Sequence, residues 1–143
     1  MSTDPNVLHP NPDLCDTVVA LRAGLASVSG LMADSLAAAD SPANAHAYIR
    51  RFDAQARAVA AATDAAVGAG APLPPLAGLA VSIKDLFDVA GQPTTGGSKA
   101  MADAQPAEQD CPAVARLRAA GAALTGHTNL SEFAYSGLGL NPH

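Results

Sequence analysis

The chain has 143 residues, of which 49% are hydrophobic, 15% charged and 3% aromatic. This composition excludes an intrinsically disordered chain, and no apolar run approaches the roughly 18 residues that a membrane-spanning helix needs. Eight basic and thirteen acidic residues give a net charge of −5, which argues against nucleic acid as a partner.

Cysteine and histidine usage indicates neither a disulfide framework nor a metal centre. Cys15 and Cys111 lie far apart in the sequence, and the four histidines form no paired-ligand pattern. The first eleven residues contain no lysine or arginine and do not form a signal peptide. We therefore expect a cytoplasmic protein with no metal, no cofactor and no membrane association.

Two helical regions are predicted before any strand. Asn11 and Pro12 have the pattern of an N-cap followed by proline at the first helical position. An apolar stripe then follows at spacings of four and three: Leu14, Val18, Leu21, Leu25 and Val28. This helix ends at Gly30 or continues towards Ala39. Ser41 and Pro42 repeat the start signal, and the apolar face from Ala45 to Thr63 predicts a second helix, which Gly68 and Gly70 end.

A strand, a crossover helix and a second strand are predicted next. Residues 76–83 form a continuous apolar run, as expected of a strand buried on both faces. After a long connection, Pro112 begins a helix that Gly121 ends, and residues 122–125 suit a second strand. Residues 129–132 have the form of a capping box opening a further helix. The order predicts an α/β fold, with N-terminal helices followed by the start of a mixed, helix-covered sheet.

Lys84 is the main candidate for chemistry, because it ends the first predicted strand. Ligands of α/β sheets bind at the carboxyl ends of strands. Apolar surroundings at that place would favour the neutral amine, which is able to act as a general base. The alternative from spacing alone is that Lys84 is solvated and pairs with Asp85 or Asp88.

Other candidates are weaker. Gly96, Gly97 and Ser98 would form either a backbone nest for an anion or a flexible turn. His127 follows the second strand and would be a base or, more often for a lone histidine, a structural residue. Lys99 lies in the predicted loop and is expected to be exposed.

Several motifs in order resemble the amidase signature family. They begin with residues 78–85 (Gly-Leu-Ala-Val-Ser-Ile-Lys-Asp) and continue through Phe87, Asp88, Gly91 and residues 93–98. They end with residues 113–121, 124–129 and 132–134, and Gly137. The resemblance covers residues 43–143, which divides the chain into a lead-in and helix at 1–42 and the N-terminal part of an amidase signature domain at 43–143. His127 stands where lysine is commoner in the family.

The resemblance implies a hydrolase that cleaves the C–N bond of a small-molecule carboxamide. Lys84 matches the family's catalytic lysine, the base that acts through a bridging serine on a nucleophilic serine. Both serines lie in glycine- and serine-rich segments downstream, which this sequence lacks. Ser98, Ser131 and Ser136 do not match those positions, so no nucleophile is assigned. We expect a domain truncated before its catalytic serines, and a chain that is inactive alone.

Two alternatives stay open at this point. The A subunit of a tRNA-dependent amidotransferase shares the same triad, although the acidic charge of this chain disfavours contact with tRNA. A non-catalytic binding fragment of the fold would need a sheet that closes without further strands. The sequence does not name the amide, and a homo-oligomer stays open.

Overall fold

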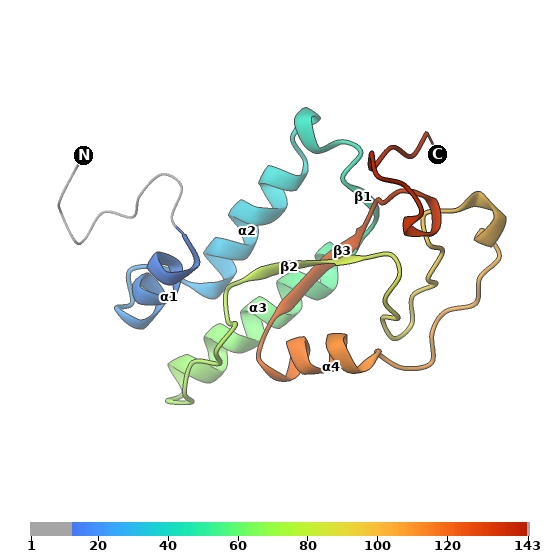
Figure 1. Ribbon diagram of the computed structural model, residues 1–143. Helices are drawn as coiled ribbons and strands as arrows, with labels where there is room; N and C mark the ends of the chain where they lie inside the picture. Colours follow the sequence, from blue (N-terminus) through green and yellow to red (C-terminus); the bar gives the residue numbers. More distant parts are fainter. Residues whose placement is uncertain (1–12, 143) are drawn as a thin grey trace.

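The computed structural model describes residues 13–142, with helices packed around a small sheet (Figure 1). The helices are α1 (Leu14–Arg22), α2 (Val28–Ala39), α3 (Asp53–Gly68) and α4 (Pro112–Ala119), and the strands are β1 (Tyr48–Arg51), β2 (Ala80–Lys84) and β3 (Ala123–Thr128). Short 3-10 turns occupy Pro42–Asn44, Lys99–Met101 and Glu132–Ala134. The predicted α/β class is therefore confirmed. Within residues 13–142, no helix is both long and apolar enough to cross a membrane.

The N-terminal stripe forms two helices rather than one. The predicted lead-in and the Asn11 cap lie outside the described residues, and Asp13 caps α1 by accepting a hydrogen bond from the Asp16 amide at 2.8 Å. Gly24, with φ of +70°, turns the chain after α1. Ser27 then caps α2 through the Gly30 amide, which is why Gly30 lies inside a helix instead of ending one.

A tertiary hydrogen bond joins α2 to α3. The Asp64 carboxylate accepts from the amides of Val28 and Ser29 at 2.8 and 2.9 Å. Burial opposes ionisation of Asp64, but the hydrogen bonds from Ser29 and Val28 outweigh it and lower the pKa of the carboxyl group. An anion is favoured at a helix N-terminus, so this contact fixes the start of α2 against the side of α3.

The second predicted helix is wrong over its first part. Tyr48–Arg51 is strand β1, which pairs antiparallel with β3. Helix α3 begins only at Asp53, and its alanine-rich body ends near Gly68 and Gly70 as predicted. Pairing with a strand more than 70 residues away overrides the helical pattern here, because aromatic and β-branched residues suit a sheet.

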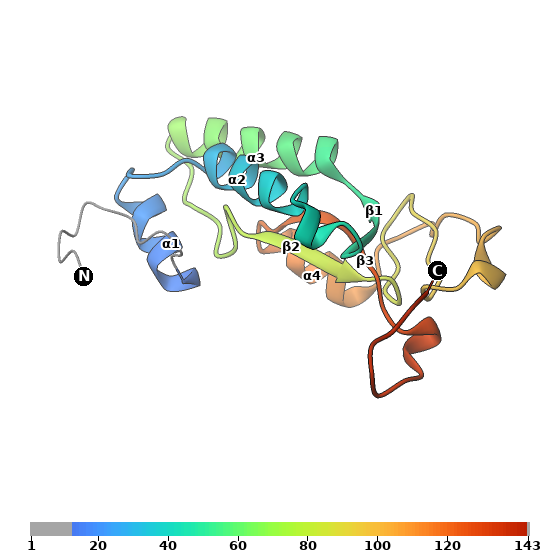
Figure 2. The same ribbon diagram turned by 90° about the horizontal axis from the view of Figure 1, so that it is seen from above.

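The sheet has the order β1-β3-β2, with β2 and β3 parallel. Seen from above, α2 and α3 lie on one side of the sheet and α4 on the other (Figure 2). Successive residues of β3 face opposite sides, so Ala123 packs with α2 and α3 while Leu124 packs with Val114 of α4. The predicted strand–helix–strand unit is thus confirmed.

Strand β2 is not buried on both faces. Ile83 is buried and Val81 half-buried on the side of α4, whereas Ala80, Ser82 and Lys84 are exposed. Strand β2 is one of the two outer strands of the described sheet. Among the described residues, its side away from β3 has no strand partner. The expected burial on both faces is therefore wrong for this part of the chain.

Gly126 is the closest backbone contact between β1 and β3. Its φ is +154°, and a Cβ atom there would lie 2.2 Å from the Arg50 carbonyl oxygen. The same Cβ would lie 2.8 Å from the Tyr48 ring. Only glycine allows this approach of two strands.

Gly126→Ala is therefore expected to lower the free energy of unfolding by roughly 2–3 kcal/mol, because backbone has to move to admit the methyl group. Urea unfolding of the purified chain measures this. The control is Gly68→Ala, at the end of α3, where an added Cβ meets no atom within 4 Å. Equal stability of both variants would contradict the close approach.

His127 makes the stability of the fold depend on pH. Its side chain is fully buried on β3 and packs edge-on against Phe52, with ring centroids 5.2 Å apart. Burial lowers the pKa of His127, the Asp85 carboxylate opposes this, and Arg50 adds to the decrease. Folded His127 therefore stays neutral at pH values where an unfolded histidine, of pKa about 6.5, already binds a proton.

The unfolded state then binds more protons than the folded state below pH of about 6.5, so stability falls as pH decreases through that value. We expect the urea concentration at the unfolding midpoint to decrease as the pH is lowered from about 7.5 to about 5. The corresponding loss of unfolding free energy is at most about 1.4 kcal/mol per pH unit. His127→Gln flattens this dependence, while His46→Gln, at an exposed position, leaves it in place. A slope that survives His127→Gln would disprove the assignment.

Candidate functional site

The carboxyl ends of the two parallel strands form the candidate site. Lys84 at the end of β2 lies beside Thr128 at the end of β3 in the strand register. The connection from Asp85 to Asp110 and the C-terminal segment from Asn129 both leave the sheet at this edge (Figure 1). This is the edge at which α/β sheets bind ligands.

Lys84 lies where the sequence predicts it, but its side chain is exposed. Its carbonyl oxygen accepts from the amides of Leu86 and Phe87, so the chain turns sharply after it. The alternative of an ion pair with Asp85 or Asp88 is wrong, because no described acidic group lies within 4.0 Å of the ammonium. The described residues thus leave the Lys84 amine unpaired, and they do not provide the apolar surroundings expected of it.

The Asp85 carboxylate turns inward and is fully buried. It accepts hydrogen bonds from the Thr95 amide at 3.2 Å, from the Thr95 hydroxyl, and from the Gly97 amide at 3.2 Å. The Asp85 main-chain carbonyl also accepts from the Gly96 amide at 2.9 Å. Both the side chain and the main chain of Asp85 therefore bind the 95–97 turn.

The glycine-rich segment is an anion nest whose anion belongs to the protein. Gly96 and Gly97 have φ of +62° and +66°, a left-handed conformation in which the Gly97 amide donates to the Asp85 carboxylate and the Gly96 amide to the Asp85 main-chain carbonyl. The Asp85 carboxylate is thus the anion that this segment binds. Of the two predictions for this segment, the nest is confirmed, and its occupant is the residue that follows Lys84.

His127 is the second neighbour of the Asp85 carboxylate, besides the 95–97 turn. Its Nδ1 atom lies 3.2 Å from an Asp85 carboxylate oxygen. Neither ring nitrogen has a hydrogen bond of good geometry among the described residues. Because burial keeps the imidazole neutral, the contact joins a buried carboxylate to an uncharged ring. His127 is thus a structural neighbour of Asp85 rather than an exposed base.

Two of the three serines considered above, Ser98 and Ser136, have side-chain hydrogen bonds within the described residues. Buried Ser98 donates to the Glu132 carboxylate and accepts from the Ala100 amide. Exposed Ser136 accepts from the Leu138 amide. The predicted helix after Asn129 is wrong: Glu132 is held by Ser98, and Phe133 adopts a positive φ of 51°.

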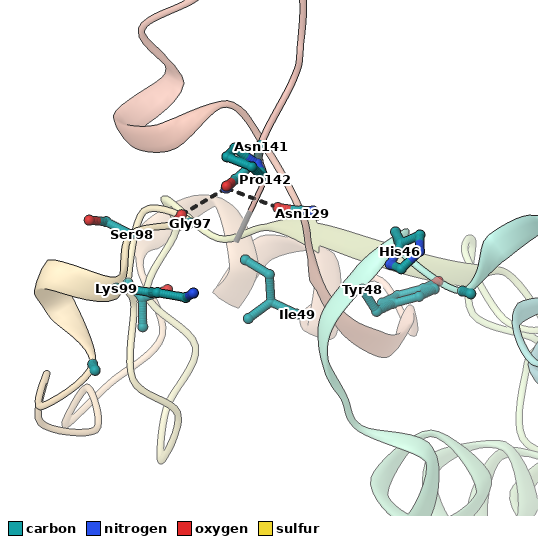
Figure 3. Close-up of a pocket in the computed structure, with 12 residues that line it drawn as sticks. His46, Tyr48, Ile49, Gly97, Ser98, Lys99, Asn129, Asn141 and Pro142 are labelled. Atoms are coloured by element: carbon teal, nitrogen blue, oxygen red, sulfur yellow. Dashed lines mark hydrogen bonds between the residues drawn. The ribbon is translucent and has the colours of Figure 1, made fainter.

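A cavity of about 650 Å³ lies between the start of β1 and the 95–99 segment (Figure 3). Its lining includes Lys99 and His46 but no acidic residue, and Lys99 extends across it towards Ile49. Asn141 lies over the cavity and donates to the Gly97 and Leu130 carbonyls. Lys84 does not line it, so the cavity and the candidate base are separate features.

Sequence reasoning found Lys84 but missed the contact of Asp85 with His127. The two residues lie 42 positions apart, and no spacing rule joins them. Their burial is visible only once β2 and β3 are paired. Within residues 13–142, no group of three or more histidine, cysteine or acidic side chains is arranged to hold a metal ion.

Comparison with known proteins identifies the family. The amidase family model matches residues 31–143. AtzE of Pseudomonas sp. strain ADP, which belongs to a 1-carboxybiuret hydrolase, is 45% identical over 98 residues, which are 68% of this chain and 21% of that protein. The A subunit of the glutamyl-tRNA(Gln) amidotransferase of Salinispora arenicola is 38% identical over 122 residues, which are 85% of this chain and 24% of the relative.

Solved structures with a similar fold are amidases. An amidase crystal structure superposes with a TM-score of 0.80 at 35% identity, covering 91% of this chain and 30% of that one. The native peptide amidase of Stenotrophomonas maltophilia gives 0.73 at 32% identity, covering 88% and 26%. The chain thus spans about a fifth to a quarter of the curated relatives, and over that span it belongs to the amidase signature family.

Proposed function

We propose that the full-length protein carrying this sequence is an amidase that hydrolyses a carboxamide C–N bond through a serine acyl-enzyme, with Lys84 as the base. The observation that carries this proposal is the position of Lys84. It ends β2 at the carboxyl edge of the sheet, and no ion pair within the described residues engages its amine. Family membership over residues 31–143 supports the same reaction class.

In the proposed reaction, the neutral Lys84 amine takes a proton from a nucleophilic serine through a bridging serine. The serine oxygen forms a bond with the amide carbonyl carbon, and the C–N bond breaks as the leaving nitrogen gains a proton. Water then attacks the acyl-enzyme ester and releases a carboxylic acid, which restores the serine hydroxyl. Both serines would come from sequence outside this chain, as would the groups that enclose the Lys84 amine.

A second candidate is the role named for one group of relatives, the A subunit of a glutamyl-tRNA(Gln) amidotransferase. The length of that match, 85% of this chain, favours it. The net charge of −5 does not favour contact with tRNA. The two functions are distinguished by the acceptor: an amidase releases the acid and ammonia into water without partner proteins, and the amidotransferase component needs its partners and charged tRNA.

The isolated chain is expected to have no amidase activity, because it would supply the base without the nucleophile. It is also expected to self-associate, since the outer side of β2 presents unpaired backbone groups. Light scattering and ammonia release on purified residues 1–143 check both statements. A chain that stays monomeric would contradict the second statement, and a chain that hydrolyses amides would contradict the first.

Lys84→Ala in the full-length protein is expected to lower kcat for amide hydrolysis by at least about 100-fold, the range for loss of a general base. Steady-state kinetics on a panel of small carboxamides measures this. Lys99→Ala is the matched control, because Lys99 is the other lysine of the chain and is also exposed. Retained turnover in Lys84→Ala would remove Lys84 from the base role.

A further inference from the structure

We infer that Asp85 is a positioning residue: clamped between the 95–97 turn and His127, it fixes the main chain of Lys84 at the carboxyl edge of the sheet. The inference rests on the proposed function, in which Lys84 is the base. It assigns Asp85 and His127 a task in that reaction although neither of them would touch the substrate.

The first support is the number of contacts that converge on one residue. The Asp85 carboxylate accepts from two amides and one hydroxyl, and the Asp85 carbonyl accepts from Gly96. The Lys84 carbonyl, one bond away, accepts from Leu86 at 2.6 Å and Phe87 at 3.1 Å. Residues 84–87 are therefore held in one conformation by a carboxylate that has almost no freedom to move.

The second support is the place of His127. It stands opposite Ile83 in the register of β2 and β3, and the next residue, Thr128, stands opposite Lys84. The contact of His127 with Asp85 therefore joins β3 to the residue that directly follows Lys84. Asp88 and Arg50, from the loop after β2 and from β1, are the other charged groups that act on the imidazole.

The third support is the chemistry of the carboxylate. A buried anion is retained only where donors satisfy it, and here every donor belongs to the turn that follows Lys84 in the chain. An amide in place of the carboxylate would present NH₂ or a single carbonyl oxygen to several donors. With its oxygen at the Oδ2 position, the amide would be an uncharged acceptor for the same three donors, and its NH₂ group would face the Thr95 N–H in place of Oδ1, so Asp85→Asn weakens the hold on the turn.

A first experiment uses residues 1–143 and needs no activity. Amide hydrogen exchange followed by NMR compares wild type, Asp85→Asn and Asp88→Asn. Asp88 is exposed and accepts only from the Thr94 hydroxyl through its side chain, which makes it the matched control. We expect exchange at Leu86, Phe87 and Gly97 to rise at least about 10-fold in Asp85→Asn, with no change in α4 and none in Asp88→Asn.

Exchange that rises at Gly97 but not at Leu86 and Phe87 would overturn the inference, because Asp85 would then hold the turn without holding Lys84. If Asp85→Asn does not fold, Thr95→Val decides the matter, since it removes only the hydroxyl donor to Asp85. It is expected to raise exchange at the same three amides, and unchanged exchange in that variant would equally overturn the inference.

The closing experiment uses the full-length protein and separates positioning from plain stability. Asp85→Asn is expected to lower kcat at least about 10-fold with KM little changed, at a temperature where the variant is folded. His127→Leu follows in the same direction, and His127→Asn, which can place a side-chain nitrogen where His127 Nδ1 lies near Asp85, restores part of kcat. Normal kcat in Asp85→Asn beside an inactive Lys84→Ala overturns the positioning role and leaves the proposed function standing. Full activity of Lys84→Ala instead overturns the proposed function. The hydrogen-exchange result on residues 1–143 still tests whether Asp85 holds the main chain of Lys84.

Discussion

The edge of the sheet that carries Lys84 depends on one buried charge. The Asp85 carboxylate has no access to solvent, so its hydration has to be replaced by donors from the protein. Thr95 and Gly97 supply them, and Gly96 and Gly97 adopt a left-handed conformation that glycine allows at low cost. Ser98 follows this turn directly, and its hydroxyl donates a hydrogen bond to the Glu132 carboxylate. This bond ties the C-terminal segment to the loop after β2. One carboxylate thereby organises both loops that border the candidate base.

The sequence predicts the central strand–helix–strand unit because its signals are local. Pro112 and Gly121 bound α4, and an apolar run before and after it suits parallel strands. Strand β1 escapes prediction because four residues carry no reliable period, and its partner β3 lies far along the chain. The capping box at residues 129–132 fails for a related reason: Ser98, from a distant loop, takes the Glu132 side chain that a helix start would need.

The candidate site also contains features that the sequence predicts and features that it does not. Lys84 is predictable, since a lysine after an apolar strand stands at the carboxyl edge of a sheet. Its exposure is not predicted, because the continuous apolar run suggests burial on both faces; in the structure Ala80, Ser82 and Lys84 are exposed while Val81 and Ile83 face α4. The pairing of Asp85 with His127 is not readable, because it arises from strand register and burial. The segment from Gly96 to Ser98 is an intermediate case: the glycines leave a nest and a flexible turn open, and only the fold shows that its amides bind the Asp85 carboxylate.

The central claim is that a lysine serves as the base for a serine acyl-enzyme. It is tested most directly by trapping that intermediate in the full-length protein with a fluorophosphonate, followed by peptide mass spectrometry. We predict one adduct, on a serine beyond residue 143, that forms at least about 100-fold more slowly in Lys84→Ala than in Lys99→Ala. An adduct on Cys15, Cys111 or Ser98, or a serine adduct that forms equally fast without Lys84, would contradict the claim.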